Sequence, residues 1–275
     1  MCPVCARGLG GALDRVAGVS AFLDADALTL AVTGGLWEHV DVVPETGSTN
    51  ADLGRLAGEG AAPGLVLATG HQRTGRGRLA RRWEAPPDTL LACSVLVAPR
   101  RPMPEWGWLP LLVGMAVTDG VRAATGLDAR LKWPNDVLVA GRKLCGILCE
   151  SVGGVDEPRA VLGFGINVGL RADQLPVPTA TSTRLEGSDV GATPLLAAVL
   201  RSLESWFTAW DRGDSVVAEY RRRCDTIGRE VVVHLADSDV TGEAVGVDAG
   251  GGLVVRTASG PRTFVAGDVE HLRPA

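Results

Sequence analysis

A short basic stretch between two apolar segments constrains the fold of this chain more than any other feature. Residues 70–83 contain five arginines and end in Trp83. Apolar residues dominate just before this stretch, at 65–67, and again after it, at 90–97, which is typical of strands buried in a sheet. The sequence therefore predicts a cationic loop that joins two buried strands.

Two glycines inside the loop, Gly75 and Gly77, indicate a site for an anion. Glycine permits backbone torsions that are closed to other residues, so consecutive N–H groups can turn toward a phosphate. Arg76 and Arg78 would add forked donors to the same group. An ordinary solvated basic loop would have a similar composition, so the downstream sequence must decide between the two interpretations.

A hairpin is predicted over residues 132–150. It begins with Lys-Trp-Pro-Asn-Asp, turns at Gly141 and continues through Lys143. Alternation along the second strand predicts that Lys143 shares a face with three apolar residues, Cys145, Ile147 and Cys149. A lysine at such a position indicates an anionic partner, although an edge lysine extending to solvent would also fit.

Two further motifs carry polar groups next to regular structure. Residues 161–168 read as a strand in which Gly163 and Gly165 leave one face bare and Asn167 offers an amide at the end. Close approach of a ligand or of another backbone would require such glycines, and simple packing would explain them equally well. Upstream, Ser48 to Asn50 precede a helical pattern and can cap it, which leaves donors facing an incoming polar group.

In this order, the four motifs resemble those of the biotin-protein ligases, enzymes that attach biotin to carboxylase subunits. The family's Gly-Arg-Gly-Arg loop begins here at Gly75, and its Lys-Trp-Pro-Asn-Asp block begins at Lys132. Its Lys-Leu-x-Gly-Ile-Leu-x-Glu block begins at Lys143, and its Gly-x-Gly-x-Asn motif ends at Asn167. The resemblance covers the chain from about Asp41 onward. It implies an α+β fold, in which a mixed sheet flanked by helices is followed by a small C-terminal barrel similar to an SH3 barrel.

The resemblance also implies a two-step reaction. Biotin and ATP, with Mg²⁺, form biotinyl-5′-adenylate, and biotin then passes to a lysine of a biotin carboxyl carrier domain. Because the first step joins a carboxylate to the α-phosphate, positioned cations must neutralise the charge. The implied catalytic residues are Lys143, Arg76 and Asp136. The implied biotin contacts are Ser48, Thr49, Asn50, Gln72, Arg76, Gly77, Arg78, Lys143 and Gly146. The implied nucleotide contacts are Arg78, Trp83, Lys132, Asn135 and Asn167, and no metal ligand is firmly assigned.

Three segments are expected along the chain. Residues 1–40 form a partly helical extension, 41–224 the catalytic domain and 225–275 the barrel. Within the extension, one amphipathic helix over residues 19–40 would bury Phe22, Leu28 and Trp37. Helices are also predicted over 195–210 and 216–224, and short strands over 230–235, 240–247, 253–257, 262–265 and 269–272.

Composition narrows the class of protein. The chain has 275 residues, 46% of them apolar, which is enough for a sizeable core, and no stretch resembles a signal peptide or a membrane span. A net charge of −5 argues against general nucleic-acid binding, and no recognition-helix pattern precedes Asp41, so no DNA-binding repressor is expected. We expect a cytoplasmic monomer or weak homodimer.

The six cysteines fit a reducing compartment. Cys2 and Cys5 have the spacing of half a zinc site, but no second pair follows, whereas Cys93, Cys145 and Cys149 read as small core residues. Two other functions remain open at this level. One is a lipoate or octanoyl ligase or transferase with the same core architecture, and the other is a sensor that binds biotin without catalysis.

Overall fold

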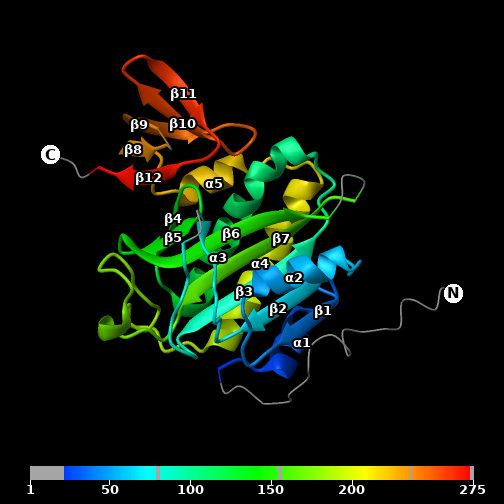
Figure 1. Ribbon diagram of the computed structural model, residues 1–275. Helices are drawn as coiled ribbons and strands as arrows, with labels where there is room; N and C mark the ends of the chain where they lie inside the picture. Colours follow the sequence, from blue (N-terminus) through cyan, green and yellow to red (C-terminus); the bar gives the residue numbers. More distant parts are fainter. Residues whose placement is uncertain (1–21, 79–80, 154–156, 236, 273–275) are drawn as a thin grey trace.

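A seven-stranded mixed sheet forms the centre of the molecule (Figure 1). The computed structural model describes residues 22–78, 81–153, 157–235 and 237–272. The strands are β1 (His39–Val42), β2 (Leu65–Thr69), β3 (Leu90–Val97), β4 (Ala129–Lys132), β5 (Asp136–Val139), β6 (Arg142–Val152) and β7 (Arg159–Asn167). Their order is β1-β2-β3-β7-β6-β5-β4, with β1 and β2 parallel and all other neighbours antiparallel. The strands predicted on both sides of the basic loop are thus β2 and β3.

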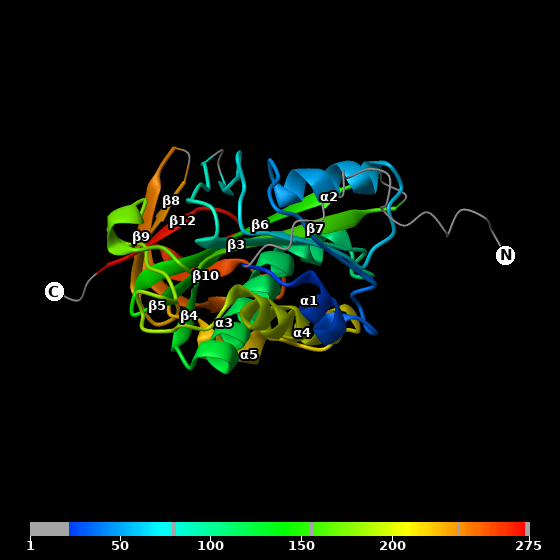
Figure 2. The same cartoon turned by 90° about the horizontal axis from the view of Figure 1, so that it is seen from below.

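Helices cover both faces of this sheet (Figure 2). One face carries α1 (Ala25–Val32), α3 (Leu109–Thr125), α4 (Ala192–Asp211) and α5 (Val217–Arg223), and the other carries α2 (Thr49–Gly58). Two short 3₁₀ helices are η2 (Met103–Trp108) and η3 (Ala172–Gln174). The main core lies between the sheet and α3 and α4, and a smaller cluster around Leu53 and Leu56 fixes α2. No helix among the described residues is both long and apolar enough to cross a membrane.

The C-terminal unit is a five-stranded antiparallel sheet, so the α+β fold expected from the sequence is confirmed. Its strands are β8 (Glu230–His234), β9 (Asp239–Val247), β10 (Leu253–Thr257), β11 (Gly260–Phe264) and β12 (Asp268–His271), in the order β11-β10-β9-β8-β12. Two indole N–H groups of the large domain attach it. Trp108 Nε1 donates to Ala249 O at 2.7 Å, and Trp133 Nε1 donates to Gly251 O at 3.1 Å.

The helix expected near the N-terminus is shorter than predicted. It runs from Ala25, after its cap Asp24, to Val32, because Thr33 already adopts an extended backbone with a ψ of 159° and Gly34 follows with a φ of +102°. Leu28 and Trp37 are buried as expected, but Trp37 lies beyond the helix and donates its indole N–H to Leu200 O. Residues 22–40 thus pack into the core of the large domain, while Cys2 and Cys5 lie outside the described residues.

Candidate functional site

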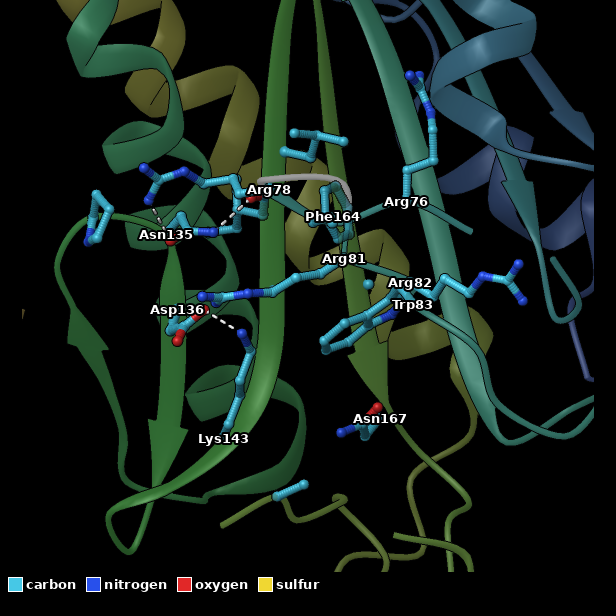
Figure 3. Close-up of a pocket in the computed structure, with 18 of the residues that line it drawn as sticks. Arg76, Arg78, Arg81, Arg82, Trp83, Asn135, Asp136, Lys143, Phe164 and Asn167 are labelled. Atoms are coloured by element: carbon cyan, nitrogen blue, oxygen red, sulfur yellow. Dashed lines mark hydrogen bonds and ion pairs between the residues drawn. The ribbon is translucent and has the colours of Figure 1, made fainter. Parts of the chain in front are cut away.

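A cavity of about 450 Å³ lies where the basic loop, the start of α2, the hairpin of β5 and β6, and strand β7 meet (Figure 3). Every site residue nominated from the sequence lines it, although these residues come from separate motifs between Ser48 and Asn167. The C-terminal sheet closes one side through Asp268 and Val269. The sequence therefore predicted which residues gather, whereas their individual roles remain predictions.

A hydrogen-bonded polar cluster forms one part of the wall. Ser48 caps α2, and the backbone N–H of Thr49 donates to Gln72 Oε1 at 2.9 Å. Ser94 Oγ donates to Asn50 Oδ1 at 2.6 Å and lies 2.7 Å from Thr49 Oγ1. These side chains are all at least nine-tenths buried, so they form a fixed polar surface at the base of the cavity. Sequence reasoning missed Ser94, because a single serine inside an apolar strand gives no signal.

The bare glycines of β7 support this cluster and its neighbour Trp83. A Cβ on Gly163 would overlap Asn50 Oδ1, and a Cβ on Gly165 would overlap the indole nitrogen of Trp83. Gly146, opposite Gly165 on β6, would meet the far edge of the same indole at 3.2 Å. The glycines thus permit close approach, as predicted, but here it is side chains that approach.

Lys143 and Asp136 form an ion pair in the cavity. Lys143 Nζ lies 2.6 Å from Asp136 Oδ1 and 5.4 Å from the ring centre of Trp83, so the predicted anionic partner is present. The predicted strand face is wrong. The register of β5 and β6 shifts by one residue, which leaves Leu144 without a partner and places Lys143 on the face of Gly146 instead of that of Cys145.

The prediction about Gly75 and Gly77 is also corrected. Neither has a positive φ, and the N–H of Gly77 donates to Arg81 O at 2.7 Å, so it does not face the cavity. Gly75 is required for another reason, since a Cβ there would overlap the carbonyl oxygen of Trp83. The loop closes on itself through these contacts instead of presenting a row of N–H groups.

All five loop arginines have protein partners. Arg76 pairs with Glu150 at 2.9 Å, and Figure 3 shows it pointing away from the Lys143–Asp136 pair. Arg78 donates to Asn135 Oδ1 at 3.1 Å, so two of the implied nucleotide contacts bond each other and Asn135 anchors this loop. The remaining pairs are Arg73 with Glu45, Arg81 with Asp268, and Arg82 with Glu84. The structure therefore does not bring Arg76 into contact with the other two nominated catalytic residues.

The C-terminal sheet contributes groups that the sequence did not reveal. Asp268 reaches Arg81, and Gly267 O accepts from Arg78 at 3.4 Å. Further along β12, His271 Nε2 lies 2.9 Å from Thr226 Oγ1. Burial lowers the pKa of His271 to about 4, with a further contribution from the nearby charge of Lys132. His271 is therefore neutral near pH 7, and it lies near Lys132, one of the implied nucleotide contacts.

Comparisons with known proteins agree with this geometry. Residues 42–167 match the biotin/lipoate A/B protein ligase family, and residues 226–272 match the biotin protein ligase C-terminal domain. The chain is 42% identical to a biotin--[acetyl-CoA-carboxylase] ligase of Mycobacterium tuberculosis, over 87% of this chain and 91% of that protein. It is 28% identical to a bifunctional ligase/repressor of Bacillus subtilis, over 81% of this chain and 71% of that protein.

A solved structure has the same fold and a related sequence. The biotin protein ligase from Aquifex aeolicus, in complex with biotin and ATP, superposes with a TM-score of 0.73 at 26% identity, covering 86% of this chain and 100% of that one. The similarity to the Mycobacterium tuberculosis ligase extends over nearly the whole length of both chains. By its sequence, its two matched domains and its fold, this chain belongs to the biotin protein ligase family.

Proposed function

We propose that the cavity joins the carboxylate of biotin to the α-phosphate of ATP and then delivers biotin to a lysine of a carboxylase carrier domain. The observation that carries this proposal is the arrangement of the wall along β7. The buried polar cluster lies over Gly163, Trp83 lies over Gly165, and the Lys143–Asp136 pair lies beside Gly146. A polar ring, an apolar chain and an anionic end thus each meet a matching surface.

The residue roles follow from these positions. The side chains of Thr49, Asn50 and Gln72 would hydrogen-bond the ureido ring of biotin, and the bare glycines would hold its ring and chain under the Trp83 indole. Lys143 would neutralise the charge shared by carboxylate and phosphate, because its side chain lines the cavity beside the bare Gly146. Asn167, at the end of β7, would reach the nucleotide.

Arg76 requires a rearrangement in this scheme. Its guanidinium pairs with Glu150, although its side chain lines the cavity. The pair is partly exposed, and such ion pairs contribute only about 0–1 kcal/mol. An arriving adenylate could therefore take over Arg76 at small cost.

The site fits Mg²⁺ bound together with the nucleotide. The described residues contain no group of three or more His, Cys, Asp or Glu that could hold a metal alone, but Mg²⁺ is commonly bound by one or two carboxylates and substrate phosphates. Asp136, on the cavity wall, would supply the carboxylate. When bound, the ion would neutralise phosphate charge.

We place the carrier domain at a second groove, also of about 450 Å³. It is lined by Met103 and Val265, whose side chains are 53% and 88% exposed, and it shares Arg78, Trp133 and Asn135 with the cavity. A lysine presented there would be adjacent to the adenylate.

Val265→Asp should raise the KM for the carrier domain at least fivefold and leave the pyrophosphate exchange described below unchanged.

Biotin-dependent exchange of pyrophosphate into ATP tests the proposed chemistry directly. Exchange with biotin and none with lipoate would support a biotin ligase. Exchange with lipoate alone would instead indicate a lipoate ligase, and tight biotin binding without exchange would indicate a sensor. The variant Lys143→Ala, which keeps the cavity but removes its central cation, is the matched control for contaminating exchange.

Three further properties belong to the same proposal. The net charge of −5, and the pairing of every loop arginine with a protein group, support an enzyme without specific DNA binding. The free thiols of Cys93, Cys145, Cys149 and Cys224 support a cytoplasmic location. We further propose a monomer or weak homodimer, which sedimentation of the purified protein would test.

A further inference from the structure

Lysine is almost absent from this chain. Of its 27 lysines and arginines, only Lys132 and Lys143 are lysines, and both line the cavity. All other basic side chains, including those spread over the helices and the C-terminal sheet, are arginines. Apart from the α-amino group, every primary amine of the chain therefore faces the site in which an acyl-adenylate would form.

This distribution matters because an acyl-adenylate reacts with free amines. The amine nitrogen bonds to the acyl carbon, the bond from that carbon to the phosphate oxygen breaks, AMP leaves with the electron pair, and the nitrogen loses a proton to water. Only the unprotonated base reacts. At pH 8 about 0.4% of an ordinary lysine is unprotonated, whereas the fraction for arginine is roughly 10²- to 10³-fold smaller. A surface of arginines is consequently inert to the adenylate.

The two lysines in the cavity differ in their surroundings. Lys143 Nζ is held at 2.6 Å from Asp136 Oδ1, so this amine is already engaged by a carboxylate and is not free to approach an acyl carbon. Lys132 is half-buried on the same cavity wall, and none of the ion pairs found in the described part of the chain includes it. Its neighbour His271 is neutral near pH 7 and offers no countercharge.

We propose that this enzyme resists acylation by the adenylate it makes, and that Lys132 is the one side chain at which it can acylate itself. The proposal rests on the function proposed above, because only an enzyme that makes an acyl-adenylate has to resist it. Its chemistry can be tested without catalysis, because preformed biotinyl-5′-adenylate can be added to the protein directly.

The experiment compares three forms of the full chain. One is the parent, the second is Lys132→Arg, and the third restores surface amines with the charge conserved, as Arg122→Lys, Arg212→Lys and Arg256→Lys together. These three arginine side chains are 47%, 61% and 64% exposed and line neither the cavity nor the groove, so the substitutions should leave the fold intact. After incubation at pH 8, biotin is located by peptide mass spectrometry, with the α-amino group scored separately.

We expect the parent to carry at most one side-chain biotin, on Lys132, and Lys132→Arg to carry none. The triple variant should gain biotin at each of its three new lysines. A triple variant labelled no more than the parent would overturn the surface argument, and label on Lys143 or an unlabelled Lys132 would overturn the assignment of Lys132. If pyrophosphate exchange failed, the proposed function would fall, while these labelling results would stand unaltered.

Discussion

The substitution Gly163→Ala tests whether the bare face of β7 is required by the polar cluster above it. An added Cβ would overlap Asn50 Oδ1, and Asn50 is only 6% exposed, so it has little space to move. Its side-chain oxygen accepts a hydrogen bond from Ser94 Oγ at 2.6 Å. Its side-chain nitrogen donates to Glu150 Oε2 at 2.8 Å and to Leu148 O at 3.0 Å. Moving the side chain breaks these contacts together.

The magnitude follows from these three hydrogen bonds. At about 1 kcal/mol each, their loss costs about 3 kcal/mol, and the reduced freedom of the unfolded chain in a Gly→Ala change offsets about 0.5–1 kcal/mol. The free energy of unfolding should therefore fall by about 2 kcal/mol. Because the same side chain is proposed to bind the ureido ring, the Kd for biotin should rise about tenfold or more, which corresponds to 1.4 kcal/mol.

Urea unfolding followed by tryptophan fluorescence, and calorimetric titration with biotin, measure the two effects. Gly58→Ala is the matched control, because a Cβ there meets nothing within 4 Å; it should leave the Kd for biotin unchanged and stabilise α2 by a few tenths of a kcal/mol. In an Asn50→Ala background the cost of Gly163→Ala should largely vanish, since the clashing atom is gone. Gly163→Ala with parental stability and parental biotin affinity would refute the reasoning.

Three further outcomes are expected. Lys143→Ala should slow single-turnover adenylate formation by about 10²-fold or more with little loss of stability, and a parental rate would remove Lys143 from the mechanism. A chain ending before Gly228 should lose ligation more than biotin binding, provided that it stays folded by circular dichroism; normal ligation would contradict a role for the C-terminal sheet. Because the pKa of His271 is lowered to about 4 in the folded protein, the unfolded state binds an extra proton between about pH 6.5 and 4, and stability should fall across that range as pH decreases. This loss should be up to about 2 kcal/mol after allowance for solvent screening, and it should disappear in His271→Gln; equal pH dependence in the two proteins would contradict it.

The fold was predictable where its signals are local. Strands β8 to β12 appear within about two residues of their predicted bounds, because glycine, aspartate and proline separate short alternating segments. Helix α3 gave no comparable signal. Eight of its first nine residues are buried, so it lacks the polar face that makes a helical period visible. The N-terminal helix shows the reverse error, because it was predicted too long. Apolar residues keep a helical spacing past Gly34, although the backbone at Gly34 is no longer helical.

The candidate site was likewise predictable only in part. Residues inside contiguous motifs were found, because each motif combines several residue types that a structural role alone would not require together. Ser94 was missed because it is the single hydroxyl in the apolar strand β3, and Asp268 and His271 were missed because they belong to a short polar strand, β12, that carries no motif. Ser94 meets Asn50 across 44 residues of sequence, and Asp268 meets Arg81 across 187. Such contacts exist only once the sheet order is known.

Lys143 shows why a correct motif can still yield a wrong geometry. Strict alternation places it with Cys145, on the face that packs against the helices, where an ammonium group would have no solvent and no partner. The unpaired Leu144 adds one residue to β6, and since side chains alternate with a period of two, this reverses the face of Lys143 relative to the residues that follow. Lys143 and Gly146 thereby come to lie on one face, with the lysine Cε 3.5 Å from where a Cβ of Gly146 would stand. The cation reaches Asp136 through a backbone irregularity that no residue type in the hairpin announces, which is why the partner could be predicted from charge and the face could not.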